Sequence, residues 1–78
     1  MDTRTPIEEH EAERMIDARV QRATQRDRRY LNAENAEQQS QAELVIELEA
    51  TVAVLEKYDV DGWSLEGARE QLEAEYAA

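Results

Sequence analysis

Apolar residues recur at helical spacing through most of the chain and predict a protein built from helices. In the N-terminal part they stand three or four positions apart, from Ala12 through Ile16 and Val20 to Tyr30. This spacing places them on one face of a helix. The surrounding sequence is rich in Ala, Glu, Gln, Arg and Leu, which are all good helix formers.

A capping pattern predicts where this first helix begins. Thr5 and Glu8 can form a capping box around Pro6, and proline is favoured at the first helical position. Neither glycine nor proline follows until Gly62. We therefore expect a long N-terminal helix over about residues 6–33.

A polar stretch over residues 32–41 holds no large apolar side chain and leaves the next step open. Ser40 and Glu43 have the spacing of a second capping box, directly before an apolar run. This pattern predicts a turn near Glu37 and a second helix over about residues 41–58. The chain would then fold back on itself as a helical hairpin.

The alternative to the hairpin is one long helix. The apolar stripe keeps one heptad-like phase across the polar stretch, from Ile16 to Tyr58. One unbroken helix over residues 6–58 could therefore form a coiled-coil oligomer. We favour the hairpin because a coiled coil needs an apolar seam that is sustained over several heptads, and polar residues interrupt this one.

The C-terminal half predicts a central helix and a short last helix. Residues 44–55 are apolar on two faces, and a helix that is apolar nearly all round is expected in the middle of the fold. Gly62 then supplies a turn and Ser64 a cap for a helix over about residues 64–77. Its apolar stripe is Leu65, Ala68, Leu72 and Tyr76. All 78 residues are thus expected to form a single all-α domain, a three-helix hairpin or bundle.

Size and composition add expectations about environment. A core in a chain of this length supplies only a few kcal/mol of net stability, so we expect help from a partner chain, which a homodimer would provide. The sequence has no cysteine, which fits an intracellular protein. The first six residues hold no apolar signal core, and no stretch approaches the about 20 apolar residues that span a bilayer. A cytoplasmic protein without a membrane segment is expected, in the host cytoplasm if the protein is viral.

Residues able to support catalysis are scarce. His10 is the only histidine, and Ile7 stands where a helical di-metal site would need a glutamate. The two serines both stand at predicted helix caps, so no pairing of nucleophile and base is indicated. The run that begins at Asp59 is similar to a calcium-binding loop. Such a loop requires glycine at its sixth position, where this chain has Ser64. We expect no catalytic activity, no cofactor and no metal.

The formal net charge of −10 favours basic partners and disfavours nucleic acid and anionic lipid. The same charge can serve solubility alone. The charge is segregated, because residues 14–29 carry six of the nine basic residues and only two acids. One face of this helix presents Arg19, Arg22, Arg26 and Arg29. Either Arg26 and Arg29 pair with Glu43 and Glu47 across the hairpin, or the arginine face binds phosphate or an acidic partner.

Glutamates form two ladders on the later helices. One ladder is Glu66, Glu70 and Glu73, and the other is Glu43 and Glu47. Neighbours in a ladder lie roughly 6 Å apart, so the carboxylates could imitate the phosphates of DNA for a basic protein groove. The last helix would itself be repelled by nucleic acid, so direct nucleic-acid binding is not expected.

In size, charge and helical content the chain resembles small acidic phage inhibitors of host nucleic-acid enzymes, including anti-CRISPR and anti-restriction proteins. The resemblance implies a non-enzymatic inhibitor or regulator that binds the basic surface of a nucleic-acid-handling protein through its carboxylate ladders. The alternative is a helical structural component of a virion or a multi-subunit assembly, which the continuous apolar phase would suit.

Overall fold

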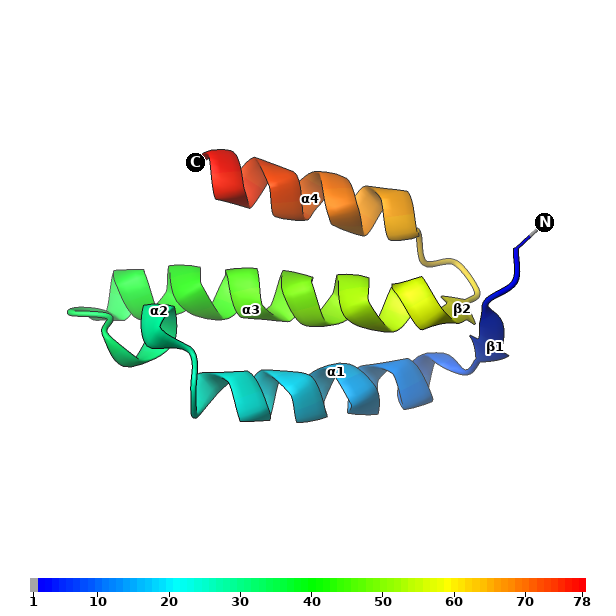
Figure 1. Cartoon of the computed structure of the whole chain (residues 1–78), viewed down its shortest axis with the longest axis horizontal. Helices are drawn as coiled ribbons and strands as arrows, with labels where there is room; N and C mark the ends of the chain where they lie inside the picture. The colour runs from blue at the N-terminus through cyan, green and yellow to red at the C-terminus, as the bar shows by residue number, and fades with distance from the viewer. Residues whose placement is uncertain (1) are drawn as a thin grey trace.

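A computed structural model describes residues 2–78 and shows the predicted all-α architecture, with a small strand pair at one end (Figure 1). The elements in chain order are β1 (Thr5–Ile7), α1 (Glu9–Thr24), α2 (Arg28–Leu31), α3 (Ala36–Lys57), β2 (Tyr58–Val60) and α4 (Leu65–Ala77). None of the helices within residues 2–78 combines the length and the apolar composition needed to cross a bilayer.

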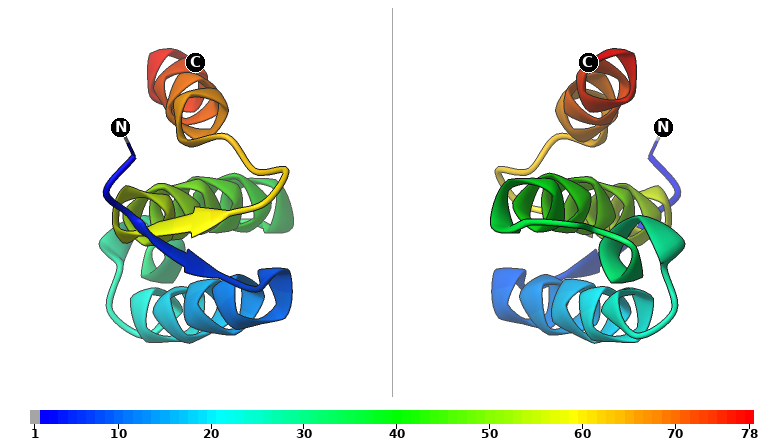
Figure 2. Two further views of the ribbon diagram at one scale, coloured as in Figure 1. Left: turned by 90° about the vertical axis from the view of Figure 1, so that its right-hand side faces the viewer. Right: turned by 90° about the vertical axis from the view of Figure 1, so that its left-hand side faces the viewer.

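The three long helices lie side by side in one layer, with α3 between α1 and α4 (Figure 1). The Cα trace measures 44 × 25 × 16 Å. The layer has two broad faces. Figure 2 places α2 on one of them and the link between β2 and α4 on the other. We call these the α2 face and the open face.

The best-buried part of the core lies at the C-terminal end of α3. Val54, Leu55 and Val60 are each 1 % exposed, and Ala12 of α1 is completely buried. Further along the hairpin, Ala23 of α1 and Ala50 of α3 line the same hollow. The apolar character of α3 on two faces follows from its position, because α1 packs on one edge and α4 on the other.

The first helix begins at Glu9 and not at residue 6, so the capping box predicted around Pro6 is wrong. Glu8 occupies the cap position, and its side chain makes no capping hydrogen bond. Thr5 and Pro6 are extended instead and belong to β1. The fixed φ of proline suits an extended edge strand as well as a first helical turn, so the local sequence alone did not decide between the two.

The strand β1 pairs with β2 as a parallel two-stranded ribbon, which the sequence analysis did not predict. Thr5 stands beside Tyr58, and Ile7 stands beside Val60. A three-residue strand pair is at best marginal on its own. Here Ile7 is packed against the core and Val60 belongs to it, so tertiary burial supports the ribbon.

The chain reverses over residues 25–35, so the alternative of a single helix over residues 6–58 that forms a coiled-coil oligomer is wrong. The first helix ends at Thr24 and not at residue 33, and α3 begins at Ala36, five residues before the predicted start. Asn35 caps α3, because its side-chain oxygen accepts the backbone N–H of Gln38 at 2.9 Å. Ser40, the predicted cap, lies inside the helix.

Replacing Asn35 with alanine should lower the free energy of unfolding by about 1 kcal/mol, because the capping hydrogen bond is lost. Ser40→Ala is the matched control and should change stability by less than about 0.5 kcal/mol, since Ser40 is an exposed residue inside a helix. Urea unfolding followed by circular dichroism measures both. Equal losses from the two variants would contradict the assignment of the cap.

The turn before α4 forms as predicted. Gly62 has a positive φ of 82°, and the Trp63 N–H donates to the Val60 carbonyl at 3.0 Å. A turn of this shape needs a left-handed residue at the position of Gly62. Ser64 caps α4, because its hydroxyl oxygen accepts the Gly67 N–H at 3.0 Å. This turn fixes the position of Trp63.

Candidate functional site

Three hollows in the molecular surface meet at Trp63. The first, about 660 Å³, lies at the ribbon end of the molecule beside the start of α1. The second, about 490 Å³, lies between α1 and α3. The third, about 400 Å³, lies between α3 and α4. Trp63 lines all three, and we call the three hollows together the Trp63 surface.

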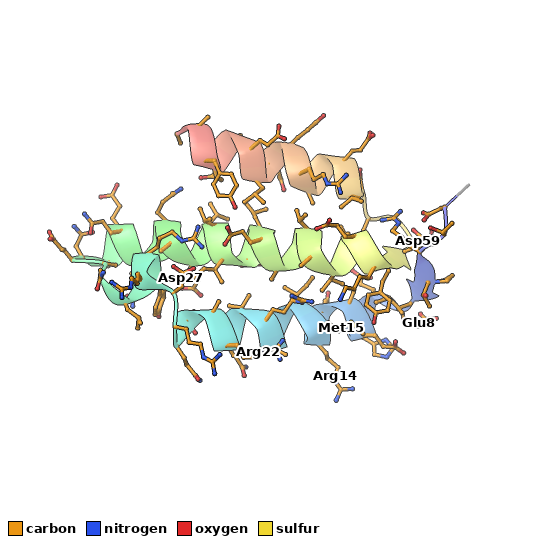
Figure 3. The ribbon with its side chains drawn as sticks, viewed as in Figure 1. Glu8, Arg14, Met15, Arg22, Asp27 and Asp59 are labelled. Carbon is orange, nitrogen blue, oxygen red and sulfur yellow. The ribbon has the colours of Figure 1, made fainter. Side chains whose placement is uncertain are left out.

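The Trp63 surface is strongly acidic. The first two hollows are lined by eight carboxylates: Glu8, Glu9, Glu11, Glu13, Asp17, Glu47, Asp59 and Asp61. No lysine or arginine of the described chain lines any of the three hollows. Figure 3 shows two of these acids, Glu8 and Asp59, near one another at the ribbon end. These carboxylates come from α1, α3 and β2 and from the links before α1 and after β2, so segments far apart in the sequence contribute to one surface.

Helix geometry and one turn place the groups of this surface. Glu9, Glu13 and Asp17 follow one another at four-residue steps and share one face of α1. Glu47 of α3 lines the hollow between α1 and α3 together with Glu13 and Asp17. Trp63 is half-buried and packs against the core, so its ring is held in place while part of it lines the hollows. An indole face attracts cations, and carboxylates around it strengthen that preference.

Comparisons with known proteins leave this surface to be interpreted from its own geometry. No protein-family model, curated protein or solved structure matches the chain. Within residues 2–78, no group of three or more potential ligand side chains is placed to hold a metal ion. The functional argument therefore rests on the lining of the Trp63 surface.

A second polar cluster ties α2, α3 and α4 together, and we call it the Glu49 network. Arg29 binds Asp27 at 2.5 Å and Glu49 at 2.7 Å, and the Tyr76 hydroxyl donates a hydrogen bond to Glu49. The four side chains come from three helices and the cap of α2. The network therefore fixes the short helix α2 and the end of α4 to the central helix.

The Glu49 network shifts the protonation of its members. A hydrogen bond from the Arg29 side chain holds the pKa of Asp27 below its ordinary value. Burial by itself would raise the pKa of Glu49, but the hydrogen bonds from Arg29 and Tyr76 outweigh it and leave the pKa below its ordinary value of 4.5. The same hydrogen bond to Glu49 raises the pKa of Tyr76.

The reversal of the chain divides the predicted arginine face, which we call the arginine stripe and which consists of Arg19, Arg22, Arg26 and Arg29. Arg29 lies on α2 and pairs with Glu49, so the predicted pairing with Glu43 and Glu47 is wrong for this residue. The reason is the short helix, which turns Arg29 away from the line of α1. No ion pair within residues 2–78 joins Arg26 to either glutamate.

The other arginines of the stripe remain on α1 or just beyond it. Arg19 is half-buried and lines a hollow between α1 and α3 together with Glu49. Arg22 and Arg26 are exposed. Figure 3 shows that Arg14 points away from α3, at the outer edge of the layer. The stripe is thus not one continuous binding face, and its role in binding a partner stays a prediction.

The predicted carboxylate ladders have different positions. Glu66, Glu70 and Glu73 are exposed on α4 and are not among the residues that line the Trp63 surface. Of the second ladder, Glu47 joins the Trp63 surface, while Glu43 is exposed and is not among the residues that line it. The role of the α4 ladder in binding stays a prediction.

The sequence analysis missed Trp63 and the acids of α1 as site residues. A pattern that could have identified the acids was present, because Glu9, Glu13 and Asp17 form a ladder at the same spacing as those on the later helices. We did not recognise this ladder because arginines follow it closely on the same helix and make residues 14–29 positively charged overall. Nothing in the sequence alone indicated that Trp63 would border three hollows.

Proposed function

We propose that the protein is a non-enzymatic binding module that holds a basic segment of another protein on the Trp63 surface. One observation carries the proposal: three hollows meet at Trp63, eight carboxylates line two of them, and no basic residue lines any. Carboxylates and an indole ring together suit the side chains of arginine and lysine.

The partner that best fits this chemistry is a nucleic-acid-handling protein, because such proteins carry clusters of arginine and lysine that bind phosphates. The acidic surface would occupy those side chains and compete with nucleic acid for them. Long-range attraction between opposite charges would also speed the encounter. An inhibitor or regulator, such as a phage protein directed at a host enzyme, would act in this way.

The test compares two triple variants that change net charge by the same amount. One replaces Glu13, Asp17 and Glu47 with the matching amides, and the other replaces Glu66, Glu70 and Glu73. A fluorescent peptide of nine arginines serves as the probe, and anisotropy at low and at high salt gives its affinity. We expect the first variant to lose at least about tenfold more affinity than the second, because the contacts are local, and we expect wild-type binding to weaken with salt.

Either of two results would overturn the proposal. Equal losses in the two variants would mean that the peptide responds only to net charge. A larger loss in the α4 variant would place the site on the ladder of Glu66, Glu70 and Glu73. Circular dichroism of both variants should match the wild-type spectrum, since all six side chains are exposed.

A further inference from the structure

The open face of α3 continues the Trp63 surface along the helix. Leu44, Glu47, Leu48 and Thr51 follow the spacing of one helix face. Glu47 and Thr51 line the hollow that contains Trp63, so the two leucines lie on the same side of the layer. Leu44 is 42 % exposed, a large value for a leucine beside a core.

Two hollows flank this face at Thr51, and we call the face together with these flanks the trough. On the α1 side stand Glu13 and Asp17. On the α4 side stand Gly67 and Gln71. Figure 2 shows no further helix of the described chain on this side of the layer. The trough therefore has an apolar floor, one acidic wall and one wall without charge.

The molecule exposes more surface than a compact monomer of its size. Its accessible area is 5789 Å², whereas about 4,900 Å² is typical for this mass. Its radius of gyration is 13.3 Å, compared with about 11.5 Å for a compact chain of this length. The excess area is roughly 900 Å², similar to the about 800 Å² that each partner contributes to a standard protein interface.

We infer that the trough over Leu44, Leu48 and Thr51 is the docking site for an amphipathic helix of the partner, with an apolar face on the leucines and a basic flank on Glu13 and Asp17. The inference rests on the proposed function and names the form in which the basic segment binds. Such a helix would add a fourth member to the helical layer, in the helix-in-groove mode of recognition.

The negative charge of the trough favours a basic helix over a second copy of this chain. Two copies packed through the same open face would bring the carboxylates of Glu13, Asp17 and Glu47 toward their own counterparts, which opposes association. A basic helix meets the opposite sign. The floor from Leu44 to Thr51 spans about 11 Å at 1.5 Å per residue, so two turns of a partner helix would fill it.

The test uses two lysine–leucine peptides of 15 residues and identical composition. In one the leucines follow a helix stripe, and in the other their order is scrambled so that no apolar face forms. We expect the striped peptide to bind at least about tenfold more tightly and to gain helicity on binding, as measured by anisotropy and circular dichroism. Leu44→Ser should remove most of the preference for the striped peptide, whereas Leu44→Met, which keeps an apolar side chain, should retain it.

Leu31→Ser is the matched control, because Leu31 is 56 % exposed and lies on α2, away from the trough. It should leave the preference unchanged. Equal binding of the two peptides, or an unchanged preference in Leu44→Ser, would overturn the inference. If the amide variant of Glu13, Asp17 and Glu47 still lost its arginine-peptide affinity in that case, the proposed function would stand without it. A concentration-dependent dimer that Leu44→Ser abolishes would assign the trough to a second copy and would also overturn the inference.

Discussion

Replacing Leu55 with alanine is expected to lower the free energy of unfolding by about 3 kcal/mol, within the range measured for buried leucines. Leu55 is 1 % exposed and belongs to the core where α3 meets the strand ribbon. A domain of this length has a total stability of roughly 4–12 kcal/mol, so the variant should lose a large part of it. Urea unfolding followed by circular dichroism gives the difference.

Leu44→Ala provides a control of the same residue type on the same helix. Because Leu44 is 42 % exposed, its truncation removes little buried surface and should cost less than about 1 kcal/mol. Similar losses at Leu44 and Leu55 would mean that the open face is buried in solution. That result would contradict the arrangement of the helices in one layer.

Removing the carboxylate at the centre of the Glu49 network should have the second-largest effect. Glu49→Ala leaves Arg29 and Tyr76 without their shared partner and should cost about 2 kcal/mol, since hydrogen bonds to charged groups contribute more than neutral ones. Glu56→Ala is the control on the same helix. Glu56 pairs with Arg69 only at 3.6 Å and in solvent, so its loss should cost at most about 0.5 kcal/mol.

The contribution of Glu49 should also depend on pH. Its folded pKa lies below the ordinary value of 4.5, so the stabilisation is complete above that value and is lost as the pH falls through the folded pKa. The difference in unfolding free energy between wild type and Glu49→Gln should therefore be constant near neutral pH and shrink below about pH 4.5. Taking the difference cancels the effect of the large net charge. A difference that grows on acidification would contradict the network.

The features that could be predicted from the sequence are those that depend on residues close together in the chain. The apolar residues of α3 appear on two faces because both edges of that helix are covered, and the cap at Ser64 and the turn at Gly62 form from residues next to one another. The cap of α3 was harder to identify, because Asn35 and Ser40 both satisfy local capping rules. The helix begins at the earlier one, since that start adds another turn of hydrogen bonds.

The parts that the sequence did not predict depend on segments far apart in the chain. Thr5 and Pro6 are extended because β2 lies beside them, and no pattern near Pro6 reveals that neighbour. The Trp63 surface has the same origin. Helix spacing indicated that acids share faces, but only the packing of α1 on α3 brings Asp17 to Glu47, and only the turn at Gly62 sets Trp63 between them.

The parallel ribbon has a consequence for the alignment of the two hairpin helices. Their contact includes small and branched side chains such as Ala12, Ile16 and Ala50. Figure 2 shows that the strands run across the direction of the helices, so a slip of one helical turn would move β1 sideways relative to β2 by about 5.4 Å, more than the about 4.8 Å between paired strands. Strands of three residues would then lose most of their pairing. The pairing of β1 with β2 therefore stabilises one alignment of α1 on α3 relative to alignments that are shifted by a helical turn.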